Sequence, residues 1–368
     1  MLDGNERRLF VAATSQNDGK TTCTLGFLDA YRDRAKSRGF IKPVGQRYVM
    51  VHGEEIDEDS VLIQKVCDLH CPLKDMSPVA IARNFTRSFL DDPEALRPRL
   101  EHDIHESFAK AAEGNDLIVI EGTGHAGVGS IFDLSNARVA SMLKAKVVIV
   151  TLGGIGRPVD EVALNQALFE KEHVEVLGVV ANKIQPEKLE QTRDYLGKAF
   201  ARRGLPLLGT IPYVPRLTWP SIGQVAKAIK AKVLNGHQSL SHKVAQIVVG
   251  AMTPHNAIKY IMDKALLVVP GDRDDVVLAA VTTDLLRKDI ELSGIILTGG
   301  MQLAVQTREL VMRTTIPVLS VEMPTYETTA MLHSITVKIH ETDEEKIDLV
   351  TSLVRQYVDL DKVWGALA

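Results

Sequence analysis

The sequence has few cysteines, no long apolar run and no excess of basic residues, and each absence excludes a class of protein. Its 368 residues contain three cysteines, which are too few for a disulfide framework. No apolar stretch reaches the ~20 residues that span a bilayer, and the first residues lack the apolar run of a signal peptide. We therefore expect a cytoplasmic protein that does not associate with membranes.

The charge is nearly balanced, because 43 Lys and Arg residues face 47 Asp and Glu residues, for a net charge of −4. No basic stripe is present, so the sequence offers no electrostatic footprint for nucleic acid. Cys67, His70 and Cys71 lie close together. Structural zinc usually takes four ligands, and no second Cys/His cluster follows, so we predict no metal role for this trio.

Short apolar runs alternate with helical periodicity over the first part of the chain. The runs are residues 9–13, 39–44, 117–120, 147–150, 176–180 and 207–211. Fully apolar runs are typical of parallel strands that are covered on both faces. The alternation with helices predicts an α/β fold with a parallel sheet.

A second alternation of strands and helices begins near residue 239. Its expected strands are residues 247–249, 266–269, 294–297 and 317–320, with helices near 255–262, 274–288, 302–312 and 325–333. The pattern predicts a second, smaller α/β domain. The expected boundaries are a nucleotide-binding domain over 1–215, a linker over 216–238, the second domain over 239–340 and a C-terminal helix over 341–368.

A phosphate loop is predicted where the first strand joins the first helix. The segment reads Asn17-Asp18-Gly19-Lys20-Thr21-Thr22. A glycine lets backbone N–H groups approach phosphate oxygens, lysine neutralises the β- and γ-phosphates, and the hydroxyl joins the magnesium shell. Thr14 stands where the common motif has a further glycine, so the loop is a deviant one. The alternative is a charged residue that opens an ordinary helix.

Two more charged residues are expected beside this loop. Glu121 ends the buried run 117–120, and ligands of α/β sheets bind at the carboxyl ends of strands. It could hold Mg²⁺ directly or through water, unless it is a strand-ending acid that faces solvent. Lys42 precedes Pro43 at the end of the second expected strand and could neutralise a transferring phosphoryl group. Its alternative is a surface lysine before a turn.

Together these motifs resemble dethiobiotin synthetase and its relatives, over about residues 8–215. The shared features are a deviant loop ending in Gly-Lys-Thr, the Lys42-Pro43 turn and the turn Glu121-Gly122-Thr123-Gly124. Residues 59–64 resemble the start of that family's magnesium-binding helix. Residues 181–183 and 211–213 resemble its adenine-binding segments.

The resemblance implies a P-loop NTPase domain that binds ATP and Mg²⁺. It implies Lys20, Thr21 and Lys42 on the phosphates, with Lys20 and Lys42 as the catalytic pair. It places Thr21, Asp59 and Glu121 on magnesium, and Asn182 and Pro212 in the segments that hold adenine. The stretch Thr14–Asp18, Gln46 and the segment 122–138 with His125 depart from the synthetase, so dethiobiotin synthesis itself is not expected. His125 could be a base, a substrate contact or only a loop histidine.

The second half resembles the DRTGG domain. Gly271-Asp272-Arg273 and Thr298-Gly299-Gly300 carry its signature letters at two strand ends. Asp272, Arg273, Thr298, Gly299 and Gly300 could bind an anionic ligand there, or form a structural salt bridge and a tight turn. In the N-terminal region of some phosphate acetyltransferases, such a domain follows a synthetase-like one, and we expect this chain to be that region standing alone.

Two functions are compatible with the sequence. The first is an enzyme that uses MgATP to phosphorylate a carboxylate or carbamate and then forms a ring or an amide. The second is a nucleotide-dependent regulator whose second domain recognises an unknown small metabolite or a partner. A homodimer or a higher homo-oligomer is expected in either case.

Overall fold

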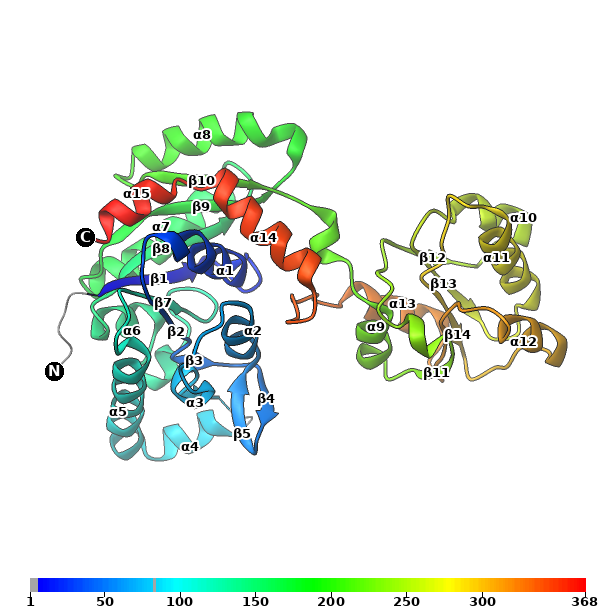
Figure 1. Ribbon diagram of the computed structural model, residues 1–368, viewed down its shortest axis with the longest axis horizontal. Helices are drawn as coiled ribbons and strands as arrows, with labels where there is room; N and C mark the ends of the chain where they lie inside the picture. The colour runs from blue at the N-terminus through cyan, green and yellow to red at the C-terminus, as the bar shows by residue number, and fades with distance from the viewer. Residues whose placement is uncertain (1–5, 82–83) are drawn as a thin grey trace. The chain divides into compact units, whose positions relative to one another are not determined.

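The computed structural model describes residues 6–81 and 84–368, which form two compact units (Figure 1). The first unit contains Met1–Tyr213 and Ile339–Ala368, and the second contains Val214–Lys338. Residues 1–5, where the sequence lacks a signal-peptide run, lie outside the described residues, as do residues 82 and 83 of the predicted first domain. Within the described ranges, no helix combines the length and the apolar character needed to cross a bilayer.

The first unit is built on a parallel sheet with the strand order β10-β9-β8-β1-β7-β2. Its strands are β1 (Arg7–Ala13), β2 (Arg38–Ile41), β7 (Leu117–Glu121), β8 (Lys146–Leu152), β9 (Val176–Ile184) and β10 (Leu207–Pro212). In the register, Val11 of β1 lies opposite Glu121 of β7, and Ile41 of β2 lies opposite Ile120. The carboxyl ends of these three strands therefore meet at one edge of the sheet.

Both faces of this sheet are buried, as the apolar runs predict. Phe10 and Ile120 belong to a core that includes residues of α5, α6, α7 and α8, whereas Leu9 and Val119 alternate with them and are equally buried. The helices of the unit are α1 (Lys20–Ala30), α2 (Glu58–Val66), α3 (Leu73–Met76), α4 (Phe85–Asp91), α5 (Pro93–Ala112), α6 (Asn136–Met142), α7 (Arg157–Lys171) and α8 (Leu189–Ala201). Short 3-10 turns occupy Tyr31–Asp33, Ser130–Phe132 and Pro186–Lys188.

The C-terminal segment of the chain returns to the first unit. It forms α14 (Glu344–Tyr357) and α15 (Leu360–Ala366), and α14 lies against α1 (Figure 1). A Cβ atom added at Gly26 would come within 2.3 Å of Val354, and Arg355 Nε lies 2.6 Å from Asp29 Oδ2. The predicted separate C-terminal helix over 341–368 is thus two helices, of which α14 packs on the helix after the phosphate loop.

The second unit contains a smaller sheet with the order β11-β15-β14-β13-β12. Its strands are β11 (Lys232–Asn235), β12 (Gln246–Val249), β13 (Ala265–Pro270), β14 (Gly294–Thr298) and β15 (Val318–Ser320). Its helices are α9 (Ile222–Ala228), α10 (Pro254–Ala257), α11 (Asp274–Leu286), α12 (Val305–Val311) and α13 (Thr325–His333), with 3-10 turns at Pro215–Thr218, His237–Ser239 and Ile258–Tyr260. The predicted class, a parallel-sheet α/β domain followed by a smaller α/β domain, is confirmed.

The predicted linker over 216–238 is wrong. This stretch contains α9, whose N-cap Ser221 forms a capping box with Gln224, and β11, which pairs antiparallel with β15 at the edge of the second sheet. The weak apolar pattern of residues 216–238 is typical of a short edge strand, which needs fewer apolar residues than a central strand.

The segment over 71–103, which shows no clear period, contains α3, α4 and the start of α5. Asp92 caps α5 by accepting a hydrogen bond from Ala95 N at 3.2 Å, and Pro93 stands in its first turn. Proline is favoured at that position because its missing N–H would have no partner there. Pro98 lies inside the helix, where sequence rules expect a break.

A β-hairpin that the sequence pattern did not predict follows β3 (Val44–Gly45), which pairs with β6 (Val79–Ala80). The hairpin consists of β4 (Tyr48–Val51) and β5 (Glu54–Asp57). His52 and Gly53 form its turn with φ values of 51° and 89°. Two consecutive positive φ values are typical of a two-residue hairpin turn, but histidine is not among the residues that usually signal one. The hairpin positions Asp57 at the start of α2.

Candidate nucleotide and magnesium site

The phosphate loop lies between β1 and α1, as predicted. Gly19 has a φ of 110°, and a Cβ atom added there would lie 2.0 Å from Asn182 Nδ2. Only glycine fits such a left-handed and crowded position. Lys20 and Thr21 begin α1, and Thr22 follows in its first turn. Backbone N–H groups at the N-terminus of a helix favour anions, so the loop has the geometry of a phosphate site.

Asp18 shapes the loop from within. Its side chain is buried and accepts hydrogen bonds from Thr14 Oγ1 at 2.8 Å and Ser15 N at 2.6 Å. Asn182 Nδ2 donates to Asp18 O at 2.8 Å, and the adjacent Lys183 donates to the carbonyl of Asn17 at 2.7 Å. Burial raises the pKa of Asp18, although its two hydrogen bonds oppose the rise.

Asp18→Asn is therefore expected to leave stability at pH 7.5 unchanged or raised. The pKa of Asp18 is higher in the folded state than the unfolded value of 3.8, so the folded protein binds the proton more tightly and the burial penalty applies above the folded pKa. The advantage of the variant should shrink as the pH falls towards 3.8. Urea unfolding at several pH values between about 4.5 and 7.5, roughly one unit apart, measures the stability difference between the variant and the wild type, because a raised carboxyl pKa affects stability in this range.

Asp18→Ala is the matched comparison, because it also removes the acceptor of Thr14 and Ser15. Relative to Asp18→Asn, it should lose about 1–3 kcal/mol at every pH, as expected for unsatisfied buried donors. If Asp18→Asn were as destabilised as Asp18→Ala at neutral pH, the charge of Asp18 would be required by the fold.

Lys20 bridges the phosphate loop and the turn after β7. Its Nζ donates to Ser15 O at 3.2 Å and to Gly124 O at 3.3 Å. Burial lowers the pKa of Lys20, although the charge of Glu121 opposes this effect. A buried ammonium that contacts two neutral carbonyl oxygens would form a stronger, charge-assisted hydrogen bond with a phosphate oxygen.

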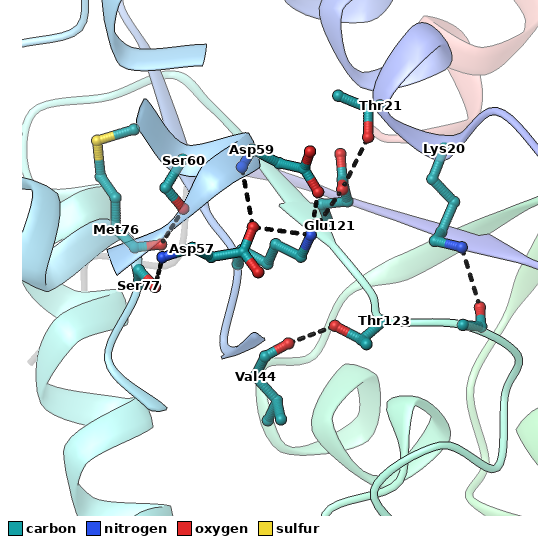
Figure 2. A network of polar contacts seen from close by, with 12 residues as sticks. Lys20, Thr21, Val44, Asp57, Asp59, Ser60, Met76, Ser77, Glu121 and Thr123 are labelled. Carbon is teal, nitrogen blue, oxygen red and sulfur yellow. Dashed lines mark hydrogen bonds and ion pairs between the residues drawn. The ribbon is translucent and has the colours of Figure 1, made fainter. Parts of the chain in front are cut away.

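A network of one lysine and three carboxylates lies beside Thr21 (Figure 2). Lys42 Nζ is 3.0 Å from Asp57 Oδ1 and 3.3 Å from Glu121 Oε1, and it also donates to Asp59. Thr21 Oγ1 donates to Glu121 Oε1 at 3.2 Å. The structure thus brings together Lys42, Asp59, Glu121 and Thr21, which lie far apart in the sequence. Lys42 is buried rather than a surface lysine, and Glu121 does not face solvent.

The charges in this network influence one another strongly. Burial alone would lower the pKa of Lys42, but the charges of Asp59, Glu121 and Asp57 outweigh burial and raise it well above its ordinary value. Burial raises the pKa of Glu121, and Asp59 adds to the rise while Lys42 opposes it. Burial also raises the pKa of Asp57. Three buried carboxylates around one ammonium leave an excess of negative charge that favours a further cation.

The residues present fit a magnesium ion. Glu121 Oε2 is buried and has no hydrogen-bond partner among the residues that the structure describes, and the predicted ligands Thr21, Asp59 and Glu121 all offer oxygen. Among the described residues, no three His, Cys, Asp or Glu side chains form a complete metal-binding group. Mg²⁺ does not require one, because it is usually held by one or two carboxylates together with substrate phosphates and water.

The other predicted residues lie as follows. Asn182 lies next to the loop backbone, where its Nδ2 donates to Asp18 O and its Oδ1 accepts from Lys183 N. Pro212 is half-buried at the end of β10. His125 is exposed and accepts from Gly127 N at 3.1 Å, which is the arrangement of a loop histidine.

The DRTGG residues meet at one edge of the second sheet. Pro270 of β13 lies opposite Thr298 of β14, and Gly271 N donates to Thr298 O at 3.0 Å, so the two signature segments adjoin at the carboxyl ends of these strands. Arg273 pairs with Asp275 at 2.8 Å, and Thr298 Oγ1 lies 2.7 Å from Thr325 Oγ1. Asp272, Gly299 and Gly300 are exposed.

Two residues of the first site were missed by sequence reasoning. Asp57 is the third carboxylate on Lys42, and its signal was the acidic run Asp57-Glu58-Asp59 between a strand and a helix. Asn136 holds the turn after Glu121, because its amide contacts Thr123 N at 3.0 Å, Thr123 O at 2.6 Å and His125 O at 2.7 Å. No local pattern predicts that long-range role.

Comparison with known families assigns both halves of the chain. Residues 7–221 match the AAA domain family, and residues 224–335 match the DRTGG domain. Two solved structures resemble parts of the chain, with low sequence identity and low TM-scores. The cell division ATPase MinD of Pyrococcus furiosus is 21% identical, covers 57% of this chain and 85% of its own, and has a TM-score of 0.33. The CBS and DRTGG domains of a Clostridium perfringens pyrophosphatase are 18% identical, cover 37% of this chain and 60% of their own, and have a TM-score of 0.27.

Curated relatives cover nearly the whole chain. The phosphate acetyltransferase of Nitrosomonas europaea is 27% identical over 95% of this chain and 50% of its own length. That of Pseudomonas putida is also 27% identical, over 95% of this chain and 50% of its own. The chain thus spans about half the length of these relatives, and the predicted relationship to phosphate acetyltransferases is confirmed.

Proposed function

The chain belongs to the AAA domain family, with a DRTGG domain after its P-loop unit, and we propose that this unit binds ATP together with Mg²⁺. The observation that carries the proposal is the hydrogen bond from Thr21, in the first turn after the phosphate loop, to Glu121 at the end of the neighbouring strand. It joins the expected phosphate and magnesium positions in one site.

The proposed roles follow from the contacts of each side chain. Residues Asn17–Thr22 surround the phosphates, with their backbone N–H groups and the N-terminus of α1 directed at the anion. Lys20 replaces its two carbonyl contacts, in part, by phosphate oxygens. Thr21, Asp59 and Glu121 hold Mg²⁺, which when bound neutralises phosphate charge. Asn182 and Pro212 lie towards the adenine end, with Asn182 also supporting the loop through Asp18.

Glu121→Gln and Asp59→Asn are expected to separate magnesium from nucleotide binding. Each removes one carboxylate charge and preserves the side-chain shape, so ATP affinity without Mg²⁺ should change less than about threefold. The Mg²⁺ concentration that gives half of the affinity gain should rise about tenfold, which corresponds to about 1.4 kcal/mol. Calorimetric titration of ATP at several Mg²⁺ concentrations measures both values.

Asp194→Asn provides the matched control, because Asp194 is an exposed carboxylate on α8. It should not change the Mg²⁺ response. If Glu121→Gln and Asp59→Asn both behaved like this control, the two residues would not belong to the magnesium site.

We propose that ATP binding serves regulation. The curated relatives described above are phosphate acetyltransferases, and a DRTGG unit follows the P-loop unit. In this proposal the residues Asp272, Arg273, Thr298, Gly299 and Gly300 bind a small anionic metabolite, the protein is a cytoplasmic homodimer or higher homo-oligomer, and nucleotide changes its assembly. Sedimentation with and without MgATP should then show a shift in mass.

The second candidate is an ATP-dependent ligase that activates a carboxylate or carbamate. It is favoured by Lys42, a charged ammonium beside Glu121 that could stabilise a transferring phosphoryl group. Steady ATP hydrolysis distinguishes the two functions. A rate that one small carboxylic acid or amine raises sharply supports the ligase, whereas a slow rate indifferent to such compounds, with nucleotide-dependent assembly, supports the regulator.

A further inference from the structure

Asp57 is fixed on several sides. It is 1% exposed, ends β5 and accepts a hydrogen bond from Asp59 N at 2.9 Å, which caps α2. Its own backbone N donates to Ser77 Oγ at 3.0 Å. A Cβ atom added at Gly45 would lie 2.7 Å from Asp57 Oδ2, so the chain passes close to the carboxylate. The Asp57 side chain therefore has little freedom to leave Lys42.

Lys42 and a magnesium ion would need the same oxygens. Lys42 contacts Asp59 and lies 3.3 Å from Glu121 Oε1, and these are the two carboxylates that the proposed function assigns to Mg²⁺. Two cations on the same oxygens repel each other. Lys42 can make room for the ion without losing its buried charge partner only if another carboxylate holds it.

We propose that Asp57 is a positioning residue that retains the Lys42 ammonium when Asp59 and Glu121 turn to Mg²⁺. Asp57 lies 3.0 Å from Lys42 Nζ and is not one of the proposed magnesium ligands. It lets Lys42 shift its pairing while staying buried and beside the phosphate site. The inference rests on the proposed MgATP function.

Asp57→Asn in the full chain tests this role, because asparagine keeps an oxygen for the Asp59 N–H and removes only the charge. Without that charge, Lys42 has Asp59 and Glu121 as its remaining carboxylates and competes with Mg²⁺ for them. The Mg²⁺ concentration that gives half of the gain in ATP affinity should rise about tenfold, which corresponds to about 1.4 kcal/mol. ATP affinity without Mg²⁺ should change less than about threefold. Glu58→Gln removes an exposed charge next to Asp57 and should leave both values unchanged.

The second readout is Lys42 itself. Acetylation by acetic anhydride in the MgATP complex, followed by peptide mass spectrometry, should proceed several-fold faster at Lys42 in Asp57→Asn than in the wild type, relative to Lys198 in the same sample. An unchanged rate at Lys42, or an equal loss of ATP affinity with and without Mg²⁺, would overturn the proposal, because Asp57 would then act only through its own charge or only through the fold. Failure of the wild type to bind ATP would instead refute the proposed function on which it rests.

Discussion

Lys20→Ala is expected to abolish measurable ATP binding, with a loss of at least about 100-fold, or about 2.7 kcal/mol. Lys20 Nζ is buried between Ser15 O and Gly124 O, at the position where the loop would receive the β- and γ-phosphates. Hydrogen bonds to a charged group contribute about 1.5–3 kcal/mol each, and alanine removes every one that Lys20 makes to the nucleotide. Calorimetric titration of ATP in the presence of Mg²⁺ measures the effect.

Lys198→Ala serves as the control for this experiment. Lys198 lies on the surface of α8 and pairs with Asp194, so its removal changes the net charge by the same amount without touching the loop. It should bind ATP as the wild type does. Equal affinity for Lys20→Ala and Lys198→Ala would mean that the glycine-lysine turn opens an ordinary helix.

Lys42→Met is expected to destabilise the first unit by about 3–5 kcal/mol, which is typical when one partner of a buried ion pair is removed. The methionine would fill the space, but Asp57, Asp59 and Glu121 would be left buried with no ammonium between them. Urea unfolding followed by circular dichroism measures the loss. A change of less than about 0.5 kcal/mol, the range of an ordinary surface substitution, would contradict the account of the network.

Adding Glu121→Gln to Lys42→Met separates charge from packing. The double variant has one unpaired carboxylate fewer than Lys42→Met, so it should recover part of the lost stability. If methionine destabilised by poor packing alone, Glu121→Gln would give no recovery.

Much of the first unit was predictable because its determinants are local. Buried parallel strands are apolar on both faces, and their carboxyl ends meet at one edge. Glu121 and Lys42 each stand at the end of an expected strand, so both could be expected beside the phosphate loop. Their ion pair, and the contact of Thr21 with Glu121, depend on the register of β1, β7 and β2, which local sequence does not encode.

The missed features share a dependence on distant partners. Strand β11 is short and is stabilised by pairing with β15, some eighty residues later, so residues 232–235 resemble a linker. Pro93 and Pro98 each suggest that a helix is interrupted, but α5 begins at Pro93 and continues through Pro98. Asp57 resembles a solvated acid until the hairpin that ends on it is known. The amide of Asn182, which resembles a base contact, also donates to Asp18 O, and this distant contact has no local signal.

The most direct test of the central claim is a crystal structure of the full chain with a non-hydrolysable ATP analogue and Mg²⁺. We predict the β- and γ-phosphates within hydrogen-bond distance of Lys20 Nζ and the backbone of residues 17–22, and the Mg²⁺ ion on Thr21 Oγ1 and at least one of Asp59 and Glu121. A nucleotide bound elsewhere, or a loop that stays empty with Lys42 still shared by all three carboxylates at saturating ligand, would contradict the account.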